Sequence, residues 1–299
     1  MTTTTMTPAA PMAPLPVRKR TRTPGEVTAG MVKMALLVFF AAVILMPVYV
    51  LVITSIKSAA EYGAATAWSL PQAPTLAGWA AAWEALAPAL LRSVILAVVA
   101  AAVSSMLGSM NGFVFAKWKF PGADIIFTMF LFGMFIPYQA VMIPLQALMI
   151  NMNNTAPFLA GIPTLIIAHT IYGIPICTLI FRNYYATAVP SEILEAARVD
   201  GANMWRIYRS IVLPVSAPAF VVTLIWQFTS AWNDFLFALF LTNRNTGPVT
   251  YALMELASAQ NPDYARTMAG VLIASLPTLV VYIVLGKYFI SGLMSGSVK

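Results

Sequence analysis

Six long apolar segments constrain this 299-residue sequence more than any other feature does. They cover about residues 31–54, 93–116, 125–150, 158–181, 215–241 and 268–290. Each is long enough to cross the hydrocarbon core of a bilayer, which takes about 20 residues of helix. Lipid offers the backbone no hydrogen-bond partner, so such segments must be helical, and their continuous apolar character does not fit a β-barrel. The sequence therefore predicts an all-α membrane protein with six transmembrane helices.

The rest of the composition excludes several classes of protein. With 60% hydrophobic and 9% charged residues, the chain has too few polar side chains to cover a water-exposed surface, which excludes a soluble protein. The same composition excludes a disordered chain, which needs low hydrophobicity and high net charge. Its single cysteine, Cys177, and its single histidine, His169, exclude a disulfide framework and a Cys/His zinc cluster. A nucleotide-binding P-loop is missing, and ionisable groups are scarce within the six segments. Any uphill transport must therefore draw its energy from another subunit, and a membrane enzyme lacks its catalytic groups.

The distribution of lysine and arginine predicts how the helices are oriented. Placing the N-terminus in the cytoplasm leaves thirteen of the 17 basic residues on the inner side. Basic residues are retained on that side, so we expect both termini to be cytoplasmic. The net charge of +7 then favours attraction to the anionic inner membrane face rather than to nucleic acid.

These observations divide the chain into three parts. We expect a disordered cytoplasmic tail over residues 1–30, a six-helix transmembrane domain over 31–291 and a cytoplasmic C-terminal tail over 292–299. A signal peptide is the competing interpretation of the first apolar segment. That segment is longer than the apolar core of a signal peptide, which indicates a retained helix.

The longest inner loop, residues 186–214, carries the most informative pattern. We expect a short helix with Ser191 as its N-cap and its end at Gly201. Leu194, Ala197 and Gly201 recur at helical spacing and give this helix a small apolar face. Such a helix can lie in a groove of another protein, or it can lie flat on lipid headgroups. The periodicity alone favours neither.

The same loop resembles the EAA motif of ABC importer permeases. The matching positions, with both gaps of the motif, are Glu195, Ala196, Ala197, Gly201, Ile211, Leu213 and Pro214. The six-helix layout, the Trp-Asn-Asp-Phe segment at 232–235 and residues 292–299 resemble the maltose-type (MalG-like) carbohydrate permeases. The glycine that usually follows the final lysine in that family is absent here.

The resemblance implies the type I fold of ABC importer permeases, with a cytoplasmic coupling helix between transmembrane helices 4 and 5. It implies a multi-pass subunit of the bacterial plasma membrane that pairs with a second, homologous permease and sits on two ATPase subunits. An extracytoplasmic sugar-binding protein would deliver the sugar. ATP and Mg²⁺ would bind the ATPase subunits, and this chain would bind no cofactor or metal and would not be an enzyme.

The resemblance also implies roles for individual residues. Coupling to the ATPase would fall to Glu195, Ala196, Ala197, Arg198, Asp200, Gly201, Ile211, Leu213 and Pro214. In the C-terminal tail, further contacts with the ATPase subunits would be made by Ser295, Gly296, Ser297 and Lys299.

Two outer segments, 55–92 and 242–267, are long. In similar permeases the second segment approaches the cleft of the binding protein. That contact would be made here by Asn243, Asn245, Gln260, Asn261, Asp263 and Tyr264. The alternative is a solvated connector with a short helix near residues 252–259. Long ordered loops more often have a function, so we favour the contact.

Sugars bind aromatic faces together with amide and hydroxyl groups, and such side chains occur inside the predicted helices. The candidate substrate pathway comprises Tyr138, Gln139, Tyr172, Trp226, Ser230, Asn233 and Asp234. Trp226, Ser230 and Asn233 share one face of the fifth helix. For Asp234, a packing or interfacial role near the outer end is an equal alternative. His169 is expected to make a helix–helix hydrogen bond rather than a ligand contact.

Gly108, Gly112 and Gly133 are expected to allow close helix packing. Together these features predict a permease subunit of an ATP-driven, binding-protein-dependent importer of a mono- or oligosaccharide. One alternative is an importer of glycerol-phosphate or a polyol, although the predicted helices offer no basic group suited to a phosphate. The other alternative is a self-contained channel or secondary carrier.

Overall fold

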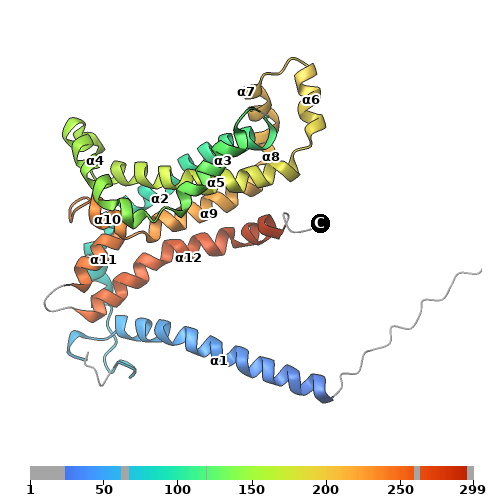
Figure 1. The fold of residues 1–299 in the computed structure, drawn as a ribbon. Coiled ribbons are helices and arrows are strands. Elements are labelled where there is room, and N and C mark those ends of the chain that lie inside the picture. The colour runs from blue at the N-terminus through green and yellow to red at the C-terminus, as the bar shows by residue number, and fades with distance from the viewer. Residues whose placement is uncertain (1–23, 62–66, 119, 259–262, 295–299) are drawn as a thin grey trace, which may run out of the picture. The chain divides into compact units, whose positions relative to one another are not determined.

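The computed structural model describes residues 24–61, 67–118, 120–258 and 263–294 (Figure 1). Within these ranges every regular element is a helix, which agrees with the predicted all-α class. The chain divides into two compact units, Met1–Tyr49 and Val50–Lys299. Most of the predicted N-terminal tail lies outside the described residues. So do the following candidate contact residues: Gln260, Asn261, Ser295, Gly296, Ser297 and Lys299.

The described part of the first unit belongs to helix α1 (Pro24–Ser55), which continues into the second unit. Large apolar side chains along this helix are exposed, with Leu37 at 64% and Ile44 at 70%. A helix that is apolar all round suits a lipid environment. The helix contains the predicted first segment, 31–54, and continues through Pro47 without a break.

The second unit contains the remaining helices. They are η1 (Ala59–Glu61), α2 (Ala77–Lys117), α3 (Ala123–Phe135), η3 (Tyr138–Val141), α4 (Met142–Thr155), η4 (Pro157–Leu159), α5 (Ile162–Ala188), α6 (Ser191–Val199), α7 (Met204–Ile207), η5 (Tyr208–Val212), α8 (Leu213–Val215), α9 (Ala217–Asn233), α10 (Leu236–Leu241), α11 (Val249–Ala257) and α12 (Tyr264–Met294). Helix α2 packs against α5, α9 and α12. The short helices α6 and α7 lie at one end of this bundle, and α10 and α11 lie at the other (Figure 1).

Four helices among the described residues are long and apolar enough to cross a membrane, and counting two bent pairs as spans gives six. The predicted third segment, 125–150, is one of these pairs, since α3 and the Tyr138–Thr155 stretch meet at 86°. Pro137 explains the bend: the residue before a proline favours extended backbone, and Ile136 has a ψ of 116°. The prediction of one continuous helix is wrong here.

Two other predicted segments also change in extent. In the fifth, α9 follows a 78° bend from the Met204–Val215 stretch, and it ends at Asn233 before Asp234 turns extended and α10 follows. The second predicted segment, 93–116, lies within a longer helix, because α2 begins at Ala77. Part of the predicted outer segment, 55–92, is therefore helical.

Glycines set the distance between α2 and α5. A Cβ added at Gly108 would lie 2.4 Å from the Cβ of Cys177, and one at Gly112 would lie 2.6 Å from the Cβ of Phe181. Glycines spaced by four residues allow helix backbones to approach in this way. The packing predictions for Gly108 and Gly112 are therefore confirmed. The prediction for Gly133 is wrong within the described chain, since a Cβ there meets nothing within 4 Å.

Candidate functional site

The loop between α5 and α9 contains the short helix that the sequence predicts. Pro190, with extended backbone, occupies the N-cap position of α6, so Ser191 lies inside the first turn. The prediction that Ser191 caps the helix is wrong. Glu192 also lies in the first turn, where its carboxylate interacts favourably with the positive end of the helix dipole.

Gly201 follows the end of α6, as predicted. Its φ of 78° is in the left-handed region, which glycine adopts without a steric penalty. The N–H of Gly201 donates to the carbonyl of Arg198 at 3.0 Å, and the N–H of Ala202 donates to the carbonyl of Ala197 at 2.9 Å. These two bonds define a Schellman motif, which satisfies carbonyls at the helix end and fixes the direction of the departing chain.

One face of α6 packs against its own chain. Leu194 is 4% exposed and belongs to a core cluster with Phe181 and Tyr185, and Ala197 packs against the same cluster. A partner cannot contact a side chain that is buried in this way. The sequence left two surroundings open for the face of Leu194, Ala197 and Gly201, a partner's groove and the lipid headgroups, and both are wrong for Leu194. Periodicity locates an apolar face but does not say what covers it.

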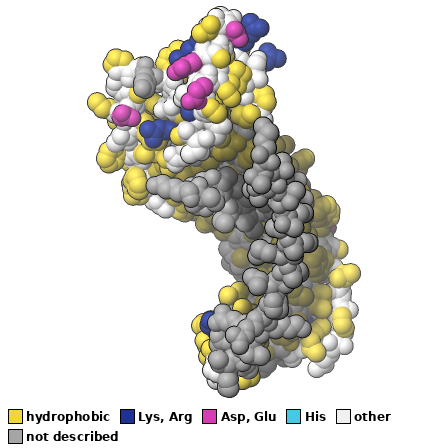
Figure 2. All heavy atoms as spheres, turned by 90° about the vertical axis from the view of Figure 1, so that its right-hand side faces the viewer, with side chains coloured by type: hydrophobic (Ala, Val, Ile, Leu, Met, Phe, Trp, Pro, Cys, Tyr) yellow, Lys and Arg dark blue, Asp and Glu magenta, His cyan; other side chains and the backbone are white. Residues whose placement is uncertain are grey.

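The opposite face of α6 is exposed. Ile193 and Val199 are 49% and 88% exposed, and Glu195 and Ala196 between them are exposed as well. Figure 2 shows charged side chains gathered at this end of the unit. The exposed charged residues of α6 and α7 and their flanks are Glu192, Glu195, Arg198, Asp200, Arg206 and Arg209. The result is a small apolar surface bordered by charges, which suits a helix that lies in a groove.

The remaining residues of the motif lie around this helix. The guanidinium carbon of Arg198 lies 4.7 Å from the ring centroid of Trp118, a cation–π contact. Ile211 and Leu213 are half-buried, and Leu213 packs against the cluster that contains Leu194. Pro214 is exposed.

A buried network of hydroxyl groups lies beneath the loop, and the sequence reasoning missed it. The Oγ of Ser109 lies 2.6 Å from the OH of Tyr185 and 2.9 Å from that of Tyr208. The OH of Tyr185 also lies 2.8 Å from the Oγ of Ser216. The four buried side chains join α2, α5, the π-helical turn η5 and the start of α9. Buried hydroxyl groups need hydrogen-bond partners. Serine and tyrosine residues within otherwise apolar helices were therefore the signal from which such a network could have been predicted.

A cavity of about 350 Å³ lies among η3, α5, α9 and α10, and we call it the inner cavity. It is lined by six of the seven predicted pathway residues: Tyr138, Tyr172, Trp226, Ser230, Asn233 and Asp234. The seventh, Gln139, is exposed and is not among the lining residues. The volume falls in the range of small-molecule pockets, about 300–1,000 Å³.

Aromatic rings form one wall of the inner cavity. The ring centroid of Phe237 lies 5.2 Å from that of Tyr138, 5.4 Å from that of Tyr172 and 5.1 Å from that of His169. The indole of Trp226, 52% exposed, belongs to the same lining. This arrangement supplies the flat apolar faces that a sugar ring can stack on.

Polar groups line the cavity beside these rings. The Nε2 of His169 lies 3.6 Å from the Oδ2 of Asp234, and the two side chains are 4% and 10% exposed. The helix–helix hydrogen bond expected of His169 involves its backbone instead, because its carbonyl accepts from the Nε2 of Gln227 at 2.9 Å. The buried imidazole itself lies between the carboxylate of Asp234 and the ring of Phe237.

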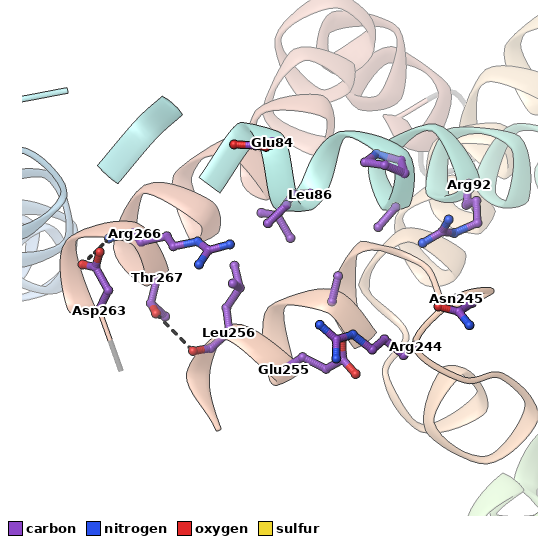
Figure 3. Close-up of a pocket in the computed structure, with 14 residues that line it drawn as sticks. Glu84, Leu86, Arg92, Arg244, Asn245, Glu255, Leu256, Asp263, Arg266 and Thr267 are labelled. Carbon is purple, nitrogen blue, oxygen red and sulfur yellow. Dashed lines mark hydrogen bonds and ion pairs between the residues drawn. The ribbon is translucent and has the colours of Figure 1, made fainter. Parts of the chain in front are cut away.

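At the opposite end from α6, a cavity of about 770 Å³ lies among α2, α11 and the start of α12 (Figure 3). Its charged lining residues are Glu84, Arg92, Arg244, Glu255, Asp263 and Arg266. The Nε of Arg244 lies 3.6 Å from the Oε2 of Glu255, and the backbone N–H of Arg266 donates to the Oδ1 of Asp263 at 3.0 Å. We call this the outer cavity.

Two of the predicted binding-protein contacts, Asn245 and Asp263, line the outer cavity. Asn243 instead shapes the preceding turn, since its Oδ1 accepts from the N–H groups of Asn245 and Thr246. Tyr264 is 39% exposed at the start of α12. The short helix that the connector alternative expects near 252–259 is α11 (Val249–Ala257). Its presence does not decide between that alternative and a contact with the binding protein.

Comparison with known proteins defines the class of this chain. Residues 108–293 match the family described as binding-protein-dependent transport system inner membrane component. The chain belongs to this family and is a multi-pass inner-membrane protein.

Individual relatives support the same class. The chain is 46% identical over 169 residues to a protein of Pyrococcus horikoshii named "Probable ABC transporter permease protein". It is 39% identical over 183 residues to the xylose/arabinose import permease protein XacI of Haloferax volcanii. The matches cover 56% and 55% of this chain, and they span 60% and 59% of the two relatives.

A solved structure confirms the fold. The chain is similar to one in the crystal structure of a bacterial ABC transporter involved in the import of the acidic polysaccharide alginate. The TM-score is 0.76 with 20% identity, over 91% of this chain and 100% of that chain. The architecture is therefore that of an ABC importer permease.

Proposed function

We propose that this chain is a transmembrane subunit of an ATP-driven, binding-protein-dependent importer of carbohydrate, of the maltose type. Its family supports an importer, and the names of relatives such as a xylose/arabinose permease and a multiple sugar permease support a sugar substrate. The observation that carries the proposal is the exposed side of α6, which includes Glu195 and Ala196. Helix α6 itself lies at one end of the bundle (Figure 1). In the plasma membrane, α6 and both termini would face the cytoplasm.

The exposed side of α6 suits docking in a groove of an ATPase subunit. Ala196 would allow close approach, and Glu195 would make a charge-assisted bond with a basic group. Leu194 anchors the helix to its own bundle, and the Schellman motif at Gly201 fixes its end. ATP and Mg²⁺ would bind the ATPase subunits, and this chain would catalyse no reaction itself.

A firm anchor matters because ATP can bias two conformations only by the difference in their contact free energies. Shifting an equilibrium from 1:99 to 99:1 takes about 5.5 kcal/mol. The cluster under α6 and the hydroxyl network link the loop to α2, α5 and α9, so movement of α6 would be transmitted to the helices around the inner cavity.

The inner cavity is the proposed place of the sugar on its way through this subunit. Trp226 and the rings around Phe237 would stack on the ring of the sugar, and Ser230 and Asn233 would bond its hydroxyls. At the other end, the binding protein would meet the outer cavity at Asn245 and Asp263, with Tyr264 nearby. A second, homologous permease would complete the pathway.

Reconstitution of the whole transporter tests this proposal. The partners of the chain are isolated by co-purification from native membranes in mild detergent, and the complex is placed in proteoliposomes. We expect ATP-dependent uptake of a sugar that requires two permeases, the ATPase and the binding protein. Uptake by this chain alone would overturn the proposal in favour of a self-contained carrier, and preferred uptake of glycerol-phosphate or a polyol would overturn the sugar assignment.

A further inference from the structure

The end of helix α2 contacts one flank of α6. Trp118 follows α2 directly, and its backbone N–H donates to the carbonyl of Val114 at 2.9 Å, which holds its backbone at the helix end. The guanidinium carbon of Arg198, in the last turn of α6, lies 4.7 Å from the centroid of the Trp118 ring. A cation and an aromatic face attract each other within roughly 6 Å, and tryptophan gives the strongest contact of this kind. Arg198 therefore stacks on its own chain.

Two further contacts join the same two helices. Beneath α6, Leu194 and Ala197 pack in the apolar cluster that includes Phe113, in the last turns of α2. Beside that cluster, the carboxylate of Glu192 attracts the positive charge of Lys117, the last residue of α2. The end of α2 thus meets α6 through apolar, charged and aromatic groups.

We propose that Arg198 is a positioning residue, which affects transport by tying α6 to the end of α2 through Trp118 and not by binding the ATPase subunit. This inference rests on the proposed function, and it leaves Glu195 and Ala196 as the residues that dock. A guanidinium that stacks on an indole of its own chain restrains α6 against the end of α2. The two elements would then move together when the ATPase subunit moves α6.

Helix α2 is suited to pass this movement on. It packs against α5, α9 and α12, and residues of α5 and α9 line the inner cavity. The backbone connects α6 to α5 and α7, so its connection to α2, which lies far away in the sequence, depends on side chains. Coupling between distant sites is carried by packed side chains and rigid helices. The pair of Arg198 and Trp118 gives α6 such a connection to the helix that contacts all three others.

A double-mutant cycle in the reconstituted transporter tests the proposal. Arg198→Met removes the charge but keeps a long side chain, and Trp118→Leu removes the ring. Each should lower the sugar uptake per ATP hydrolysed roughly two- to fivefold, which is the size expected of an exposed cation–π contact. The ATPase subunits should stay in the purified complex. The double variant should lower the ratio no further than one single substitution does, because both changes remove the same contact.

Matched variants separate this contact from general effects of substitution. Arg198→Lys keeps the cation and Trp118→Phe keeps an aromatic face, so each should lower the ratio less than Arg198→Met and Trp118→Leu do. Phe127→Leu removes the ring that lies 4.1 Å from the guanidinium carbon of Arg182. That contact is of the same kind but joins α3 to α5, so its loss should leave the uptake per ATP hydrolysed unchanged.

A covalent link between α2 and α6 provides a measurement that does not depend on replacing Trp118. Lys117→Cys and Glu192→Cys are introduced together with Arg198→Met, and a short bifunctional thiol reagent joins the two cysteines in the assembled complex. The native cysteine, Cys177, is buried. The link replaces the lost contact, so it should restore most of the uptake per ATP hydrolysed. A lost contact between Arg198 and the ATPase would not be restored in this way.

The possible results separate this inference from the proposed function. Additive losses in the double variant, dissociation of the ATPase caused by Arg198→Met alone, unchanged ratios in both single variants, or no rescue by the link overturns the inference. ATP-driven sugar uptake by the wild-type transporter would leave the proposed function intact in each of those cases. Absence of such uptake from the complete wild-type complex would overturn the proposed function and this inference with it.

Discussion

Substitutions at Gly201 test whether the end of α6 must keep its left-handed turn. At this position an added side chain would strain the backbone without colliding with a neighbouring residue. Gly201 has a φ of 78°, and a Cβ added there meets nothing within 4 Å in the described chain. A side chain would therefore affect mainly the backbone. The left-handed conformation costs an ordinary L-residue roughly 1–2 kcal/mol. A change of that size lowers the population of the Schellman geometry roughly 5–30-fold.

Three substitutions at Gly201 distinguish backbone geometry from surface charge. Gly201→Val is β-branched and should lose most uptake through strain. Gly201→Asn tolerates the left-handed region and should retain most uptake. Gly201→Asp tolerates it equally well but adds a negative charge beside Asp200, and it should abolish uptake if this surface docks to the ATPase. All three variants should insert and purify normally, since Gly201 is exposed.

The assay is ATP-dependent uptake and ATPase activity of the reconstituted transporter, with size-exclusion profiles as a control for assembly. Normal uptake by Gly201→Val would refute the requirement for the left-handed turn. Equal uptake by Gly201→Asn and Gly201→Asp would refute a charge-sensitive docking surface at this end of α6.

Three other substitutions follow from the packing. Gly108→Leu should destabilise the protein by about 1–3 kcal/mol through overpacking, whereas Gly133→Leu should leave the midpoint of denaturation almost unchanged. Tyr185→Phe should lower the free energy of unfolding by about 1–3 kcal/mol in the same assay, because the lost OH leaves the hydroxyls of Ser109 and Ser216 incompletely bonded. It should also lower the uptake per ATP hydrolysed; an unchanged ratio would contradict a role of the network in transmission. Trp226→Ala should raise the KM for the sugar at least severalfold more than Trp226→Phe does, which initial uptake rates measure.

Much of the fold could be predicted, because a segment can span the bilayer as a helix only if its apolar run is long enough, and the sequence shows these runs directly. The end of α6 was predictable as well, since Gly201 is a local signal for a helix end. The bend near Pro137 was not inferred, although the proline was present, because hydropathy follows composition and not backbone direction. The early start of α2 at Ala77 was missed because its first turns mix small, aromatic and acidic residues.

The candidate sites were predictable in residue type but only partly in arrangement. Trp226 and Asn233 share a helix face, so helical spacing correctly placed them together. Leu194 was assigned to the wrong surface because helical spacing cannot tell a face that packs on its own chain from one that meets a partner. Tyr185 gave no periodic signal at all, since its hydroxyl partners come from other helices.

The contact between α6 and an ATPase subunit is the central claim, and site-specific cross-linking tests it most directly. The chain's single cysteine, Cys177, is buried, so a cysteine introduced at the exposed Ala196 can carry a photo-crosslinker. Asn245→Cys, at the other end of the bundle, is the matched control. In native membranes, position 196 should capture the ATPase and position 245 should not. Capture of the ATPase at position 245, or of lipid alone at position 196, would contradict the account.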